Sequence, residues 1–249
     1  MSETAFITGA NKGIGYETAR QLAARGMTVL IGARDPGLGQ AAADKLRAEG
    51  ADAHFIQIDV ADEDSVARAA TRIESEFGRL DVLVNNAAIT GGLEGDGKAS
   101  SGTLATLRHV YDTNVFGLIA VTNALLPLLR RAEAARIVNV SSEVGSLTAR
   151  TDPDSPLSRM PSAIPYTASK TTVNMVTVLY AQELQDTPIK VNAANPGYTA
   201  TDLNGHSGFR TPEQGAEPSV YLATLPADGP TGTFWGHVWG SEEYARLAW

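Results

Sequence analysis

Tyr166 and Lys170 stand four residues apart in the segment "PYTASK", and such a pair could take part in proton transfer. A free tyrosine has a pKa near 10, which is too high for easy proton exchange at neutral pH. A nearby ammonium group favours the phenolate and would lower that pKa. Residues i and i+4 share one face of a helix, so Lys170 can lie close to Tyr166. Two polar residues can also share a helix face by chance, so the pair needs support from the rest of the chain.

Two further segments carry side chains that could act with this pair. The run "ARIVNVSS" ends in Ser141 and Ser142, either of which could hold a substrate oxygen. Successive strand residues face opposite ways, so one serine at most points into a given site. Asn114, in "YDTNVFG", lies within a predicted helix although asparagine is a poor interior helix residue. An exposed helical asparagine without a function is the alternative for Asn114.

Strand-like runs alternate with helical segments along the whole chain. The expected strands cover 4–8, 27–33, 53–60, 80–87, 135–142, 189–197 and 232–240, and the expected helices cover 16–26, 39–50, 62–78, 103–131, 166–185 and 211–225. This alternation predicts an α/β protein with a Rossmann-type doubly wound fold, whose seven-stranded, mostly parallel sheet has helices on both faces. No linker interrupts the pattern, so residues 1–249 are expected to form one domain that carries its own catalytic residues.

The composition argues against several other classes of protein. The chain has 249 residues, a formal net charge of −8, no cysteine and four histidines that are scattered along it. We therefore expect no disulfide, no metal site and no nucleic-acid partner, since the last usually requires a basic stripe. The N-terminus does not resemble a signal peptide, and no run of eighteen apolar residues occurs. A cytoplasmic protein without a membrane segment is expected.

The segment "TGANKGIG" connects the first expected strand to the first expected helix. Its glycines, Gly9, Gly13 and Gly15, allow a tight turn and a close approach of backbone to a pyrophosphate. The free N–H groups at the start of the following helix favour the same anion. A plain glycine-rich loop is the alternative, but the position directly after the first strand favours a dinucleotide site.

This turn resembles the T-G-x-x-x-G-x-G pattern of short-chain dehydrogenases/reductases, and its form is closest to the carbonyl reductases of that family. The order Asn114, Ser142, Tyr166, Lys170 matches the catalytic tetrad of the family. The resemblance implies that Tyr166 donates a proton and that Ser142, rather than Ser141, orients the substrate. It also implies that Asn114 bends its helix and holds a water that relays protons through Lys170, which binds the nicotinamide ribose as well.

The residues after the second strand bear on the choice between NAD and NADP. NAD enzymes with this fold usually carry an acidic residue there, whereas a cation suits the 2′-phosphate of NADP. In "IGARD" the matching position is Ala33 and the next residue is Arg34, and Lys12 of the glycine turn could reach the same phosphate. These residues favour NADP(H). The alternative is that Asp35 binds the ribose of NAD.

The resemblance also implies the remaining cofactor contacts. Asn11 and Ile14 belong to the glycine turn, Asp59 and Val60 would lie along the adenine, and Asn86 and Ala87 would lie near the ribose and pyrophosphate. The turn "NPGYTATD" would hold the nicotinamide. Ala88 stands where the family usually has glycine, which is a small departure. The residues expected at the nicotinamide are Pro196, Gly197, Thr199 and Thr201.

The expected activity is NADPH-dependent reduction of a ketone or aldehyde, with a small-molecule carbonyl compound as the partner. A 3-oxoacyl thioester reductase and a non-catalytic NADP-sensing regulator are the alternatives. The proline-rich stretch 147–165 is predicted to be a long loop that helps to shape the substrate pocket. Because this insertion is longer than in most members of the family, a monomer or homodimer is expected rather than a tetramer.

Overall fold

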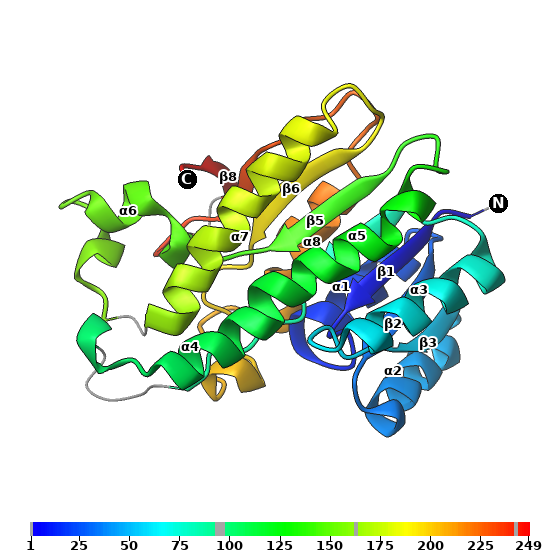
Figure 1. Cartoon of the computed structure of the whole chain (residues 1–249), viewed down its shortest axis with the longest axis horizontal. Coiled ribbons are helices and arrows are strands. Elements are labelled where there is room, and N and C mark those ends of the chain that lie inside the picture. The colour runs from blue at the N-terminus through cyan, green and yellow to red at the C-terminus, as the bar shows by residue number, and fades with distance from the viewer. Residues whose placement is uncertain (1, 93–97, 162–163, 242–243) are drawn as a thin grey trace.

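Eight strands form a single sheet in the computed structural model, which describes residues 2–92, 98–161, 164–241 and 244–249 (Figure 1). Their order across the sheet is β3-β2-β1-β4-β5-β6-β7-β8, and every neighbouring pair is parallel except β7 with β8. The strands are β1 (Thr4–Thr8), β2 (Thr28–Ala33), β3 (Ala53–Gln57), β4 (Val82–Asn85), β5 (Arg136–Val140), β6 (Lys190–Asn195), β7 (Phe234–His237) and β8 (Tyr244–Leu247).

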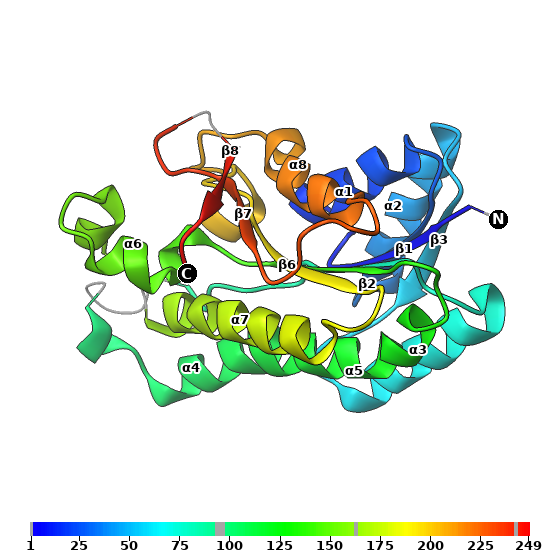
Figure 2. The same cartoon turned by 90° about the horizontal axis from the view of Figure 1, so that it is seen from above.

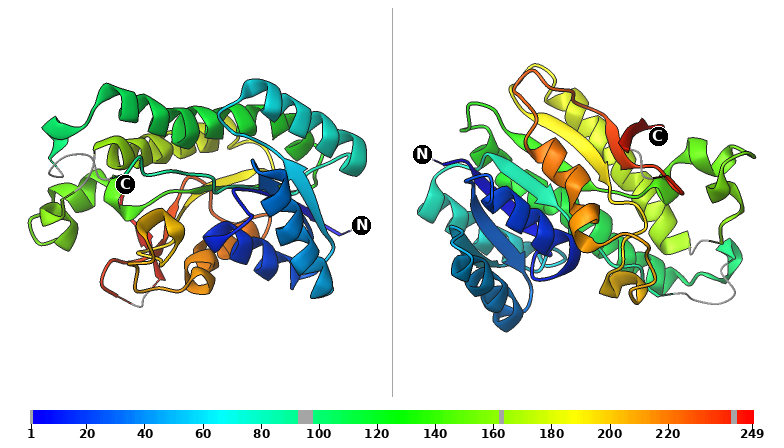
Figure 3. Two further views of the ribbon diagram at one scale, coloured as in Figure 1. Left: turned by 90° about the horizontal axis from the view of Figure 1, so that it is seen from below. Right: turned by 180° about the vertical axis from the view of Figure 1, so that it is seen from behind.

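Helices cover both faces of this sheet, as Figure 2 shows from above and Figure 3 from below and behind. One layer contains α3 (Glu63–Phe77), α4 (Leu104–Tyr111), α5 (Leu118–Leu129) and α7 (Ile164–Glu183). The other contains α1 (Gly13–Ala23), α2 (Pro36–Ala48) and α8 (Pro212–Ala223). The prediction of a doubly wound α/β fold is therefore confirmed.

The sheet separates two hydrophobic clusters, one under each helical layer. Side chains of β1 alternate between them, because Ile7 packs in one cluster and Phe6 in the other. All five residues of β1 and of β5 are buried, and so are all six of β2. Strands that are covered on both faces explain why these runs are apolar without alternation.

The structure adds an eighth strand, β8, to the seven that the sequence predicts. It pairs antiparallel with β7 at the edge of the sheet and is only partly buried. The insertion after β5 also contains short helices, α6 (Leu147–Thr151) and a 3-10 turn (Pro156–Arg159), where a loop was expected. Arg150 of α6 donates to the carbonyl oxygens of Leu157 and Met160, which makes the insertion a compact unit at one end of the molecule (Figure 1).

The helical segment Leu104–Leu129 comprises α4, a π-helical stretch (Asp112–Gly117) and α5. By length and composition alone this segment could cross a membrane, although it contains no unbroken run of eighteen apolar residues. Half of its most apolar window is buried inside the protein. Val121, Leu125 and Leu128 belong to the core cluster under this helical layer, as expected of a core helix.

Candidate active site

The four residues of the predicted tetrad come from three neighbouring elements. Ser142 follows β5, while Tyr166 and Lys170 lie in the first turns of α7, which begins at Ile164, two residues earlier than expected. Asn114 lies in the π-helical stretch that packs against α7. The structure thus gathers the tetrad beyond the carboxyl ends of the central strands, where open α/β sheets bind ligands.

Tyr166 and Ser142 interact through their hydroxyl groups. Burial raises the pKa of Tyr166 to about 12, and the hydrogen bond with the Ser142 side chain lowers it only in part. In the chain alone burial therefore outweighs the hydrogen bond that lowers this pKa, and the prediction that Lys170 lowers it stays a prediction. The Lys170 ammonium lies over the ring of Tyr166, 5.6 Å from its centroid.

Lys170 is almost fully buried, with 3% of its surface exposed. Its ammonium donates a hydrogen bond to the carbonyl oxygen of Val140 at the end of β5, with Nζ and O 2.7 Å apart. Removal from water disfavours the charged form and lowers the pKa of Lys170 to about 8. The side chain is thus held by the sheet and can lose its charge close to neutral pH.

The two serines that end β5 have different partners. The Ser141 hydroxyl is buried and bonds to Asn174 Oδ1 at 2.5 Å and to the Lys170 carbonyl oxygen at 3.3 Å. Ser142 is half-buried and meets Tyr166 instead. Ser142 is therefore the serine placed to contact a substrate at Tyr166, whereas Ser141 ties the strand to α7.

Asn114 is buried and braces the segment after β4. Its side chain accepts from the Ile89 N–H and donates to the Ile89 carbonyl oxygen, both at 2.9 Å. Its amide nitrogen also lies 3.0 Å from the Ser169 hydroxyl, next to Lys170 in the chain. The helix widens into a π-helical stretch around Asn114, which agrees with the helix distortion that the family resemblance implies there.

The glycine turn has the geometry that a pyrophosphate requires. Gly9 and Gly13 have φ angles of +64° and +57°, which favour glycine. A Cβ atom on Gly15 would come within 2.6 Å of the Gly9 carbonyl oxygen and 2.5 Å of the Asn86 amide nitrogen. The Asn86 side chain holds the turn by donating to the carbonyl oxygens of Thr8 and Gly9. The side chain of the N-cap residue, Lys12, does not cap the first N–H groups of α1, an arrangement that suits an anion at this helix start.

The other residues expected in this part of the site are close by. Asn11 and Ile14 are half-buried in the turn itself. The backbone N–H of Ala87 donates to the Thr8 hydroxyl at 3.0 Å, and a Cβ atom on Gly9 would lie 3.0 Å from the Ala87 Cα.

The loop after β6 folds back across the glycine turn. Gly197 has a φ of +70°, and the Thr199 hydroxyl donates to the Pro196 carbonyl oxygen. The Thr201 side chain would contact a Cβ atom built on Gly13, so the predicted nicotinamide and pyrophosphate residues are indeed neighbours.

Lys12 has a partner that the sequence did not suggest. Its ammonium forms an ion pair with Asp202 at 2.6 Å, and the other carboxylate oxygen of Asp202 lies 2.7 Å from His206 Nε2. Lys12 is therefore held at the loop after β6 instead of reaching freely toward a phosphate. Asp202 follows Thr201 in the chain, but only the fold reveals the contact, because 190 residues separate it from Lys12.

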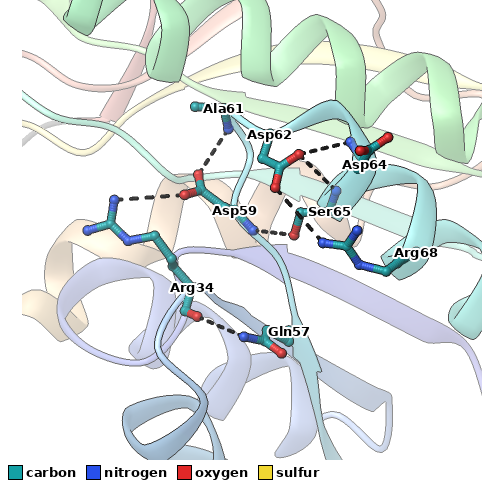
Figure 4. Close-up of polar contacts among 8 residues, drawn as sticks. All are labelled: Arg34, Gln57, Asp59, Ala61, Asp62, Asp64, Ser65 and Arg68. Atoms are coloured by element: carbon teal, nitrogen blue, oxygen red, sulfur yellow. Dashed lines mark hydrogen bonds and ion pairs between the residues drawn. The ribbon is translucent and has the colours of Figure 1, made fainter.

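The residues beyond the ends of β2 and β3 are drawn in Figure 4. Arg34 is 81% exposed at its side chain, and its guanidinium lies 4.0 Å from the Asp59 carboxylate. Asp35 instead caps α2, because its carboxylate accepts the Leu38 N–H at 2.9 Å. Val60 is buried against Gly117 of the π-helical stretch. Of the two residues after β2, Asp35 is therefore used as a helix cap, whereas the Arg34 side chain extends into solvent.

Glu143 was not predicted as a site residue, although it directly follows Ser142. It is half-buried, and its carboxylate accepts the backbone N–H of Trp239 at 2.9 Å. Burial raises the pKa of its carboxyl group. The sequence shows that Glu143 follows Ser142, but only the fold shows that its carboxyl group is half-buried. Residues 162–163 of the stretch expected to shape the pocket, and residues 93–97 of the segment between β4 and α4, lie outside the described residues.

Comparison with known proteins agrees with this geometry. The family model of short chain dehydrogenases matches residues 3–209. The short-chain dehydrogenase anuI of Penicillium roqueforti is 37% identical over 88% of this chain and 87% of its own. Carbonyl reductase [NADPH] 1 of Sus scrofa is 33% identical over 94% of this chain and 91% of its own.

A solved structure shows the same fold. Salutaridine reductase from Papaver somniferum matches with a TM-score of 0.80 and 29% identity, covering 93% of this chain and 99% of its own. The glycine turn, the tetrad order and these matches lead to one conclusion: the chain belongs to the short-chain dehydrogenase/reductase family and resembles its carbonyl reductases.

Proposed function

We propose that this oxidoreductase reduces a ketone or aldehyde to an alcohol with NADPH. The observation that supports it best is that Tyr166, Ser142 and Lys170 lie together at the carboxyl end of β5. The similarity to carbonyl reductase [NADPH] 1 of Sus scrofa supports both the reaction type and the cofactor.

The chain has residues that fit this cofactor. The positive φ angles of Gly9 and Gly13 shape the glycine turn, and the N-cap residue Lys12 does not cap the first N–H groups of α1 with its side chain. Arg34 would hold the 2′-phosphate, because it is exposed and Asp35 is already used as a helix cap.

The remaining contacts follow the family resemblance. Asp59 and Val60 would lie along the adenine, with Asn86 and Ala87 near the ribose. Pro196, Gly197, Thr199 and Thr201 would hold the nicotinamide, and Lys12 would reach the phosphate only by exchanging Asp202 for it.

The reacting residues divide the remaining work. When bound, the reduced nicotinamide supplies the hydride. The Ser142 hydroxyl donates a hydrogen bond to the substrate oxygen, and the Tyr166 hydroxyl gives its proton to that oxygen as the C–H bond forms. The Lys170 ammonium stabilises the phenolate that Tyr166 leaves behind. Asn114 would hold a water that returns a proton to Tyr166 through Lys170.

The Tyr166→Phe substitution tests this proposal. Loss of the proton donor should lower kcat at least about 100-fold, whereas NADPH affinity should change less than about twofold. Turnover is measured on a panel of ketones and aldehydes by loss of nicotinamide absorbance, and affinity by fluorescence titration. Tyr180→Phe is the matched control, because Tyr180 lies on the same helix and bonds to Asn123, away from the tetrad.

Two outcomes would contradict parts of the proposal. Equal turnover in wild type and Tyr166→Phe would exclude Tyr166 as the acid. Tight NADPH binding without turnover of any carbonyl compound, including 3-oxoacyl thioesters, would favour a regulator that senses NADPH. Among active substrates, a strong preference for 3-oxoacyl thioesters would favour a thioester reductase.

A further inference from the structure

Glu143 begins the 3-10 turn that follows Ser142, and both its backbone and its side chain are engaged. Its N–H donates to Asn195 Oδ1 at 3.1 Å, and its carboxylate accepts the Trp239 N–H at 2.9 Å. Among the residues that the structure describes, no lysine, arginine or histidine forms an ion pair with this carboxylate. The negative charge is therefore half-buried and balanced only by neutral hydrogen-bond donors.

A carboxylate in this situation lacks the partner that usually makes burial favourable. Removing a carboxylate from water is costly unless a cation or several hydrogen bonds replace the lost hydration. Burial is the largest influence on the pKa of Glu143 and raises it, while Trp239 and Asn195 lower it, and no basic side chain contributes. A positively charged group of a ligand would supply the missing partner.

Three aromatic side chains gather beside Glu143. We call Tyr198, Phe209 and Trp239 the aromatic triad, because each ring contacts the other two with centroids 5.5–6.0 Å apart. Trp239 belongs to both groups, since its N–H binds Glu143. The Arg210 guanidinium lies over the Phe209 ring, 5.4 Å from its centroid, so Trp239 and Tyr198 are the rings available to another cation. Aromatic faces attract ammonium groups, tryptophan most strongly.

One buried side chain holds these groups next to the tetrad. Asn195, at the end of β6, accepts from the N–H groups of Glu143 and Gly197 and donates to the His237 carbonyl oxygen at 2.6 Å. It thereby joins the loop that carries Ser142, the loop that carries Tyr198 and the segment that carries Trp239. Glu143 is therefore fixed directly after Ser142, and the aromatic triad is tied to Glu143 through the backbone of Trp239.

We propose that Glu143 and the aromatic triad recognise an ammonium group on the carbonyl substrate, which makes basic amino ketones the preferred substrate class. The carboxylate would pair with the ammonium group while Trp239 and Tyr198 enclose its alkyl substituents. This inference rests on the proposed carbonyl reduction and specifies its substrate. The negative net charge of −8 would also favour the approach of a cationic substrate.

The test compares two ketones of equal shape, 3-(dimethylamino)-1-phenylpropan-1-one and its neutral isostere 4-methyl-1-phenylpentan-1-one. Wild type should show a kcat/KM for the amino ketone at least about tenfold above that for the isostere, as one partly desolvated charge pair can supply. Glu143→Gln keeps an oxygen that can accept the Trp239 N–H and removes only the charge. It should abolish this preference and leave the isostere within about twofold.

Two further variants separate recognition from general effects. Glu133→Gln makes the same change in net charge at an exposed position preceding the amino end of β5, and it should leave the preference intact. Trp239→Leu keeps the backbone N–H that binds Glu143 and removes the aromatic face. It should weaken the amino ketone several-fold more than the isostere.

The possible results distinguish this inference from the proposed function. Equal loss on both ketones in Glu143→Gln, or no preference in wild type, would overturn the role of Glu143 while carbonyl reduction stands. If wild type reduces neither ketone, calorimetric titration of the amino ketone with the cofactor present tests directly whether Glu143 binds the ammonium group. Binding that Glu143→Gln abolishes would support the ammonium site, and binding that it leaves unchanged would refute it.

Discussion

At the scale of single residues, Tyr166 and Lys170 lie together in surroundings that favour the uncharged form of each. The pKa of Tyr166 is raised to about 12 and that of Lys170 is lowered to about 8. Tyr166 therefore keeps the proton that it donates in the proposed reaction at every pH at which the enzyme would be assayed. Lys170, in contrast, changes from ammonium to amine as the pH rises through about 8.

This pair of pKa values predicts a pH profile. We expect kcat/KM for carbonyl reduction to be level well below pH 8 and to fall above it, because neutral Lys170 no longer stabilises the phenolate of Tyr166. The profile is measured from about pH 6 to about pH 10 with saturating NADPH. In Lys170→Arg, whose guanidinium stays charged, any residual activity should lack this fall. A wild-type profile that stays level throughout would contradict the role given to Lys170.

Arg34 provides a second prediction at this scale. Arg34→Asp should raise the KM for NADPH by roughly 10- to 100-fold and leave that for NADH nearly unchanged, since only NADPH carries the 2′-phosphate. Arg68→Asp is the matched control, because Arg68 is a similarly exposed neighbour that pairs with Asp62 at 3.9 Å (Figure 4). Equal weakening of both cofactors by Arg34→Asp would exclude the phosphate contact.

At the scale of elements, the π-helical stretch between α4 and α5 ties two loops of the site together. Asn114 forms three hydrogen bonds there, two with the backbone of Ile89 and one with Ser169. An asparagine that is poorly suited to a regular helix is thus satisfied by groups outside it. The position of the segment after β4 and that of α7 depend on the same side chain.

Asn114→Ala should therefore lower both stability and activity. Leaving the N–H and carbonyl groups of Ile89 without partners should reduce the free energy of unfolding by about 2–4 kcal/mol. Urea denaturation measures this loss. Asn123→Ala serves as the control, because the exposed Asn123 makes one hydrogen bond with Tyr180 and should cost about 1 kcal/mol. A loss for Asn114→Ala no larger than for the control would contradict this role.

The elements also show what the sequence could predict and what it could not. Buried strands and capped helices carry local signals, so β1 to β7 and the turn after β1 were predicted correctly. Strand β8 has four partly exposed residues and is specified by its pairing with β7, which no local pattern reveals. The same limit applies to the site: a glycine pattern identifies the turn, whereas the contacts of Lys12 with Asp202 and of Glu143 with Trp239 depend on distant segments.

At the scale of the whole molecule, the two helical layers differ in their exposed apolar side chains. The layer that contains α4, α5 and α7 exposes four large ones at 54–66% of their surface: Leu104, Phe116, Met175 and Leu179. The other layer exposes fewer, with Leu38 of α2 at 57%. If two copies associate, the first layer is the face where burial would contribute most.

We expect the protein to be a monomer or a homodimer in solution. Light scattering after gel filtration should give a mass of 26.2 kDa or twice that value. If it is a dimer, Met175→Glu should dissociate it, whereas Leu38→Glu, on the opposite layer, should not. A mass four times that of the chain would show that the insertion after β5 does not prevent a tetramer.

The ion pair between Lys12 and Asp202 has a consequence for the order of events in a catalytic cycle. It fastens the loop after β6 over the glycine turn, and both side chains are more than half exposed. If a cofactor binds at the glycine turn, we expect opening of this ion pair to ease its entry and release. Dissolved salt screens exposed pairs, so higher ionic strength should speed the exchange of one cofactor for the next. Cofactor exchange would then limit the turnover rate alongside the chemical step.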